Sequence, residues 1–205
     1  MSGVRVLRGA LKGNNRLNVT LSLDTGLFNE LKRESDMSSA SVNSRINIIL
    51  ARHVHFYKIM DEIGRNMIPH NVFASMLEIM DEDKLCSIME NQSIPIIYSI
   101  FTHSGITLSL DNIEEHFFQQ AGLWSGMYSA FHSHIEPDKT INLTFEHKYG
   151  TKWSRALGRM FSSIIKNLLG IQAHYEIMGN TVKVMILGAE KLPFTKTSIL
   201  EKISV

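Results

Sequence analysis

The sequence predicts an α+β protein with two parts: an N-terminal β-α-α segment, and a helix-rich body that ends in a β-α-β-β unit. Three observations support this fold class. Residues 16–22 alternate strictly between polar and apolar side chains, which is the period of a strand with one buried face. Apolar residues at helical spacing follow this strand. Near the C-terminus, two alternating segments flank Gly179 and Asn180, a dipeptide that suits the turn of a β-hairpin.

The start of the chain is expected to form a basic arm, a strand and a short helix. Residues 1–15 contain three glycines and no acidic residue, so we interpret them as a flexible arm. The strand at 16–22 comes next. Asp24 or Thr25 can then cap a short helix, because their side-chain oxygens can accept hydrogen bonds from the first free backbone N–H groups.

A second helix is expected after a break at residues 36–39. Ser38 or Ser39 can cap it, and its apolar residues recur at helical spacing as far as Tyr57. Gly64 suits the C-terminal end of this helix. The N-terminal domain is therefore predicted to span residues 16–64, before a short linker.

Residues 70–190 are predicted to form a second α+β domain, followed by a C-terminal tail at 191–205. Periodicity, capping residues and turn residues predict its elements. They are, in order, a helix at 71–91, an apolar segment at 93–103 that suits either a buried strand or a helix, helices at 111–120 and 123–135, a strand at 140–147, a helix at 151–169, and two hairpin strands at 172–178 and 181–187.

The charges are distributed unevenly along the 205 residues. The net charge is only +1, but residues 1–60 contain nine basic and four acidic side chains, whereas residues 61–205 contain twelve basic and sixteen acidic ones. A basic first part is typical of a segment that meets a polyanion. The single cysteine, Cys86, excludes an internal disulfide, and no apolar run is long enough to cross a bilayer. We therefore expect a cytoplasmic protein.

The N-terminal segment is expected to form a homodimer. One strand followed by two helices cannot bury its apolar face or satisfy its edges alone. If the strands of two copies pair antiparallel, Leu17, Val19 and Leu21 point into a shared core. The opposite face of this two-stranded ribbon then presents three polar side chains, Arg16, Asn18 and Thr20. Such a ribbon fits the major groove of DNA, where these groups can read base edges.

Phosphate contacts are expected beside this ribbon. The second helix directs its N-terminus toward the DNA backbone, and free N–H groups at a helix N-terminus bind anions. The predicted phosphate-contacting residues are Ser38, Ser39 and Ser41 at this helix start and Lys12 in the basic arm.

These residues resemble the ribbon-helix-helix family of DNA-binding regulators. The match covers about residues 14–58: Arg16-Leu17-Asn18-Val19-Thr20-Leu21, then Leu27 and Leu31, then Met37-Ser38, Ser41-Val42-Asn43, Ile46, Leu50 and Tyr57. The resemblance implies that Arg16, Asn18 and Thr20 read bases and that Ser38 or Ser39 is the phosphate-anchoring cap. Many family members have proline after the strand, where this chain has Leu23 and Asp24, and the second helix can be aligned in two registers.

Other chemistry is less well supported by the sequence. His132 and His134 would share a face only on a strand, whereas we expect them near a helix end. A metal effector thus has weak support, although regulators that combine a ribbon-helix-helix module with a metal-sensing domain exist. Residues 147–155 could bind an anion through Lys152 or Arg155, or could form an ordinary solvated turn. No nucleotide-binding or nucleophile motif is present, so we predict no catalysis and no cofactor.

Together these observations predict a homodimeric, sequence-specific transcriptional regulator that inserts a β-ribbon into the major groove of double-stranded DNA. The C-terminal domain would add dimer contacts, or contacts in a higher even oligomer, and could sense a small-molecule or metal ligand. One alternative is an antitoxin-type DNA binder. Another is a small-molecule-binding or enzymatic α+β protein whose N-terminal segment only dimerises.

Overall fold

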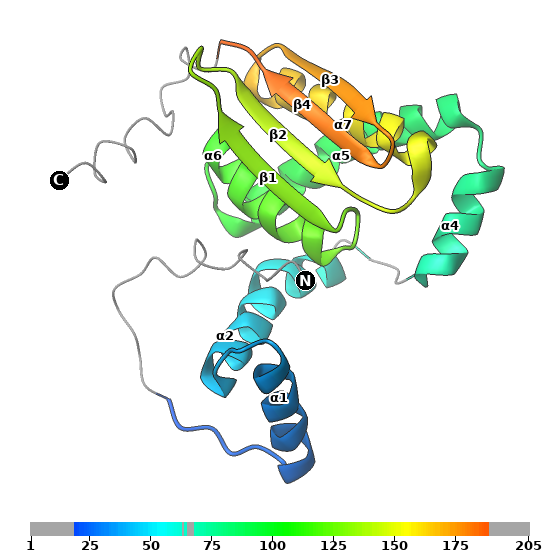
Figure 1. The fold of residues 1–205 in the computed structure, drawn as a ribbon. Helices are drawn as coiled ribbons and strands as arrows, with labels where there is room; N and C mark the ends of the chain where they lie inside the picture. The colour runs from blue at the N-terminus through cyan, green and yellow to red at the C-terminus, as the bar shows by residue number, and fades with distance from the viewer. Residues whose placement is uncertain (1–18, 63, 65–67, 189–205) are drawn as a thin grey trace. The chain divides into compact units, whose positions relative to one another are not determined.

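The computed structural model describes residues 19–62, 64 and 68–188 (Figure 1). The chain divides into two compact units, Met1–Ile63 and Gly64–Val205. Helices and a four-stranded antiparallel sheet make up the described residues, so the predicted α+β class is confirmed. Among these residues, no helix is both long enough and apolar enough to cross a bilayer.

The first unit contains helix α1 (Thr25–Met37), helix α2 (Val42–Arg52), π-helix η1 (His53–Tyr57) and helix α3 (Lys58–Glu62). The predicted first helix is confirmed, and its cap is Asp24, which accepts hydrogen bonds from the N–H groups of Gly26 at 2.8 Å and Leu27 at 3.2 Å. Residues 19–24, which include the described part of the predicted strand, form no strand in the single chain. Residues 16–18 of the predicted strand lie outside the described residues.

The second helix begins later than predicted. Its cap is Ser41, whose Oγ accepts a hydrogen bond from the N–H of Ser44 at 3.0 Å. Ser38 instead completes the last turn of α1, because its Oγ donates to the carbonyl of Glu34 at 2.8 Å. Ser39 lies in the reversal between the helices, with φ at 52°. The prediction that Ser38 or Ser39 caps this helix is therefore wrong.

The second unit begins with helix α4 (His70–Ile79) and helix α5 (Glu82–Ser104), where the sequence suggested one helix at 71–91. The break occurs because Met80 is extended and Asp81 caps α5 by accepting a hydrogen bond from the N–H of Lys84 at 3.0 Å. The ambiguous segment 93–103 lies inside α5, so the helical alternative is correct.

A short helix, α6 (Leu110–Asn112), leads into the π-helix η2 (Ile113–Gly122) and confirms a helical segment at 111–120. The cap is Ser109, whose Oγ accepts a hydrogen bond from the N–H of Asn112 at 3.2 Å. The hydroxyl of the buried Tyr128 donates to the carbonyl of Phe118 at 2.5 Å. Gly122 makes room for this ring, since a Cβ there would lie 1.9 Å from the Tyr128 oxygen.

Four antiparallel strands form one sheet in the order β1-β2-β4-β3 (Figure 1). They are β1 (Ala130–Ile135), β2 (Ile141–Glu146), β3 (Ala173–Met178) and β4 (Thr181–Ile186). The predicted strand at 140–147, the hairpin and the helix at 151–169, observed as α7 (Gly150–Leu169), are confirmed. The predicted helix at 123–135 is wrong. Residues 130–135 form β1 and pair one to one with β2, so their backbone groups form hydrogen bonds across the sheet instead of within a helix.

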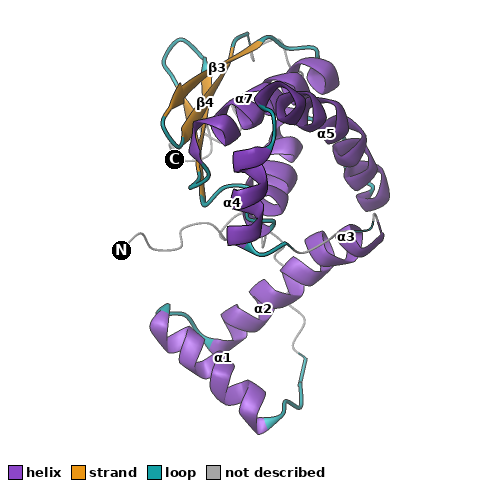
Figure 2. Ribbon diagram, turned by 90° about the vertical axis from the view of Figure 1, so that its right-hand side faces the viewer, coloured by secondary structure: helices purple, strands orange, loops and turns teal. Residues whose placement is uncertain are grey.

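Helices cover one face of this sheet, with α7 and α5 on the same side of the strands (Figure 2). The core between the layers contains Leu143, Phe145, Leu157, Phe161, Ile164, Val182, Val184 and Ile186, all fully buried. Gly158 allows α7 to approach β3, since a Cβ there would lie 2.3 Å from the ring of Tyr175. The opposite face of the sheet carries the polar side chains of each strand, including His132, His134 and His174.

Candidate nucleic-acid interface

The residues expected to form the ribbon are only partly described. Arg16, Asn18 and Lys12 lie outside the described residues. Thr20 is described and exposed, as a base-reading side chain needs to be. Its apolar neighbours Val19 and Leu21 are also exposed, at 65% and 54%.

The rest of the first unit also leaves apolar side chains uncovered in a single copy. Leu27 and Phe28 on α1, and Ile49, Leu50 and Val54 further along the chain, are all exposed. Among the described residues of this unit, only Leu31, Ser35 and Phe56 are buried. The first unit therefore leaves most of its large apolar side chains exposed in the single chain.

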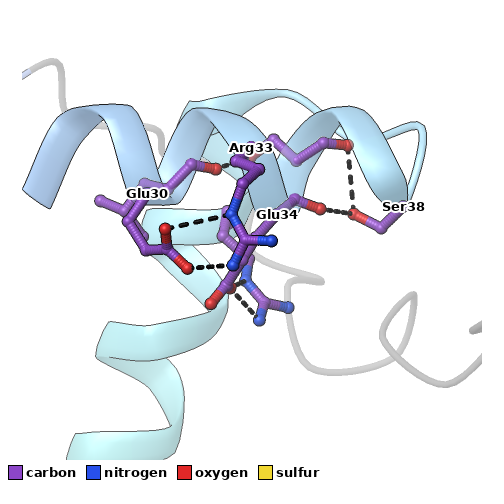
Figure 3. A network of polar contacts seen from close by, with 7 residues as sticks. Glu30, Arg33, Glu34 and Ser38 are labelled. Atoms are coloured by element: carbon purple, nitrogen blue, oxygen red, sulfur yellow. Dashed lines mark hydrogen bonds and ion pairs between the residues drawn. The ribbon is translucent and has the colours of Figure 1, made fainter.

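Polar contacts link α1 to α2 and set the position of the α2 N-terminus (Figure 3). Arg45 on α2 donates to the carboxylate of Glu34 on α1, with Nε 2.7 Å from Oε2. Along α1, Arg33 pairs with Glu30, and their hydrogen bond lowers the pKa of the Glu30 carboxyl. These pairs are partly or largely exposed, so solvent screening leaves each only a small contribution to stability.

The start of α2 has the features of an anion-binding helix end. Ser41 caps the helix, and its first turn contains no acidic residue. The side chains of Ser38, Ser39 and Ser41 are exposed around the reversal between the two helices. Free N–H groups and hydroxyls at a helix N-terminus can donate hydrogen bonds to a phosphate. Ser38 lies at the end of α1 and Ser39 lies between the two helices, so both are near the start of α2 without capping it.

Three basic residues in the first half of α7, in contrast, are engaged within the second unit. Lys152 Nζ donates to the carbonyls of Leu77 at 2.8 Å, Glu78 at 3.0 Å and Met80 at 2.8 Å, and so closes the C-terminal end of α4. Arg155 pairs with Glu82 on α5, and Arg159 donates to Glu90 at 2.9 Å. Sequence reasoning missed these roles because every partner lies about 70 residues away. Their charges are thus directed to α4 and α5, which counts against an anion site at 147–155.

A buried histidine near the start of α7 has a structural role. His147 Nδ1 accepts a hydrogen bond from the N–H of Tyr149 at 3.1 Å, so its proton sits on Nε2, 2.9 Å from Ser154 Oγ. Ser154 in turn donates to the carbonyl of Gly179 at 2.7 Å. Burial lowers the pKa of His147 to about 4. Because the Ser154 proton is directed at a carbonyl, histidine does not activate this serine as a nucleophile.

The histidines expected near a helix end lie on strand β1 instead. His132 and His134 therefore share the outer face of the sheet, and His134 Nε2 lies 3.8 Å from Glu136 Oε2. Across residues 19–62, 64 and 68–188, no three His, Cys, Asp or Glu side chains are grouped closely enough to hold a metal ion. Cys86 is buried, and burial raises the pKa of its thiol.

No protein-family model matches this chain, and no curated protein matches it. The contacts and surfaces of the two units therefore carry the functional proposal.

Proposed function

We propose that this protein is a homodimeric, sequence-specific DNA-binding transcriptional regulator of the ribbon-helix-helix type. The observation that carries the proposal is the uncovered apolar surface of the first unit, which includes Val19, Leu21 and Leu27. A second copy covers this surface if the strands at 16–22 pair antiparallel above the helices of both chains. The polar side chains that alternate with the apolar ones then face outward as a two-stranded ribbon.

In this dimer the ribbon enters the major groove of double-stranded DNA. Arg16, Asn18 and Thr20 have guanidinium, amide and hydroxyl groups, which form hydrogen bonds with base edges there. Ser41 and the N-terminus of α2 contact a backbone phosphate, together with Ser38, Ser39 and Lys12. The excess of basic residues over acidic ones in residues 1–60 supports phosphate attraction.

The second unit, in this proposal, does not read the operator. Residues 61–205 contain four more acidic than basic side chains, and Lys152, Arg155 and Arg159 of α7 are paired with groups on α4 and α5. Its own core between sheet and helices makes it a separate domain that can add dimer contacts or sense a ligand.

The test is a triple substitution of Arg16, Asn18 and Thr20 by alanine, with binding measured on specific and random DNA at matched salt. We expect folding to be unchanged and each lost base contact to cost about 1–3 kcal/mol of sequence discrimination. Lys148→Ala, an exposed charge of the second unit, is the matched control and should leave discrimination unchanged. Equal discrimination in the wild type and the triple variant would exclude the base-reading role.

A second measurement separates the two units. A chain that ends near Gly64 should keep the base preference, although it can bind more weakly, and residues 66–205 alone should show little affinity for DNA at physiological salt. The slope of affinity against salt counts phosphate contacts in each case. If residues 66–205 alone showed most of the salt dependence of the full chain, the roles of the two units would be inverted. If the full chain failed to bind nucleic acid even at low salt, the small-molecule-binding alternative would be favoured.

A further inference from the structure

Strand β1 is an edge of the four-stranded sheet. Among the residues that the structure describes, it pairs with β2 only, in a one-to-one register from Ala130↔Glu146 to Ile135↔Ile141. Figure 1 shows β1 as the outermost strand of the sheet on the side opposite β3. Six residues in regular register make a straight edge of about 20 Å.

This edge has none of the features that commonly prevent strands from pairing between chains. Such features are charged side chains, proline and bulges within the strand. The sequence of β1 is Ala-Phe-His-Ser-His-Ile, without Lys, Arg, Asp, Glu or Pro. The other edge strand, β3, carries the exposed charge of Glu176. Within Ala130–Ile135 the β1 edge therefore has no permanently charged side chain of its own, unlike β3.

The hydrogen-bond alternation shows which backbone groups point outward. The N–H of Glu136 donates to the carbonyl of Thr140 at 2.9 Å, directly after the last pair of the β1–β2 ladder. Because antiparallel pairs alternate between bonded and non-bonded positions, even-numbered residues of β1 direct their backbone groups to β2. The backbone groups of Phe131 and Ile135 are directed away from β2.

The strand is complementary to itself in one antiparallel register, the one centred on residue 133. On the helix-covered side of the sheet this register places Phe131 of one copy opposite Ile135 of the other, with Ser133 opposite Ser133 between them. On the outer side it places His132 opposite His134, and Glu136 opposite Ala130 and diagonal to His132. Phe131 thus meets an apolar partner, and a carboxylate lies near an imidazole.

We propose that β1 pairs with β1 of a second copy of this chain and joins two four-stranded sheets into one continuous eight-stranded sheet. The self-complementary register and the lack of charge in the strand identify the occupant as a second copy. The proposed N-terminal dimer adds a further reason, and to this extent the inference rests on the proposed function. It holds two copies of the second unit on short connections, which raises the effective concentration of one β1 edge at the other.

Site-directed disulfide formation tests this pairing in the full chain. In the new ladder, His132 and His134 of opposite copies form a non-hydrogen-bonded pair with Cα atoms about 4.5 Å apart, within disulfide reach. We expect a co-expressed mixture of His132→Cys and His134→Cys chains to form a covalent dimer under mild oxidation. Either variant alone should form at least tenfold less covalent dimer than the mixture. The native Cys86 is buried and does not compete.

The matched control is His174→Cys, an exposed position on the same face of the sheet but on the opposite edge strand. A mixture of His174→Cys and His134→Cys chains should not cross-link above background. All three substitutions lie on the exposed face, so they leave the core intact. Absence of the His132–His134 cross-link, or equal cross-linking in the control mixture, would overturn the proposal.

Measuring the mass of the oligomer in solution for Val19→Asp separates this inference from the proposed function. That substitution places a charge in the core of the proposed N-terminal dimer and leaves β1 unchanged. A cross-link together with an unchanged mass and unchanged specific DNA binding for Val19→Asp would support β1 pairing and reject the N-terminal dimer. Loss of mass in Val19→Asp without any cross-link in the parent would reject β1 pairing and leave the N-terminal dimer in place.

Discussion

The buried imidazole of His147 should make the second unit sensitive to acid. This side chain is neutral in the fold, where it accepts from the N–H of Tyr149 and donates to Ser154. Protonation would add a charge to a buried ring. It would also convert Nδ1 from an acceptor into a donor that faces the N–H donor of Tyr149. Burial therefore lowers its pKa from the usual 6.5 to about 4.

The size of this loss of stability on acidification follows from the linkage between proton binding and folding. A lowered histidine pKa means that the unfolded chain binds the proton more readily, so stability is full above pH 6.5 and falls as the pH drops toward 4. The complete loss is about 3 kcal/mol, and about 2 kcal/mol of it occurs between pH 7 and pH 5.

Tryptophan fluorescence is the assay, because Trp124 and Trp153 are the two tryptophans of the chain and both belong to the second unit. Urea unfolding at pH 7 and pH 5 gives the free energy of unfolding for the wild type and for His147→Asn, whose Oδ1 can still accept from the N–H of Tyr149. We expect the variant to be less stable at pH 7 but to lose about 2 kcal/mol less on acidification. Carboxyl groups titrate in both proteins and cancel in this difference.

His174→Asn is the control for this experiment. His174 is exposed on the outer face of the sheet, so this variant should follow the wild type at both pH values. If His147→Asn lost as much stability as the wild type between pH 7 and pH 5, the buried, neutral state assigned to His147 would be refuted.

Three further substitutions test contacts within the two units. Lys152→Met should destabilise the second unit by about 2–4 kcal/mol in urea unfolding, because three carbonyls at the end of α4 lose a charged donor. Gly158→Ala should also destabilise it, by about 1–3 kcal/mol, although alanine favours helices, since its Cβ would collide with the ring of Tyr175. Ser41→Ala should cost the first unit about 1 kcal/mol by removing the α2 cap, which thermal unfolding followed by circular dichroism measures. An unchanged stability in any of the three would contradict the corresponding contact.

Local patterns predicted much of this fold. Alternation identified β2, β3 and β4, and the Gly179–Asn180 turn identified the hairpin. Helical spacing identified α7, and the capping residues Asp24 and Thr25 indicated the start of α1. In each case the residues that decide the structure are neighbours in sequence, so the signal is contained in a short window.

The errors arose where distant residues decide the structure. Residues 130–135 suited a helix in isolation but pair with β2 across a hairpin, which places His132 and His134 on one face. Likewise, nothing near Lys152 in the sequence indicates that it binds the end of α4, or that Arg155 and Arg159 pair with α5.

The sequence by itself determined the α+β class and the basic character of the first part. The ribbon of Arg16, Asn18 and Thr20, inferred from alternation, stays a prediction. Tertiary structure alone decided which serine begins α2, which cations are already engaged, and which strand edge is uncharged. The physical reason is that composition and periodicity depend on residue type and short spacing. Hydrogen-bond partners, burial and sheet edges depend on which segments the fold brings together, and those segments are often 70 or more residues apart.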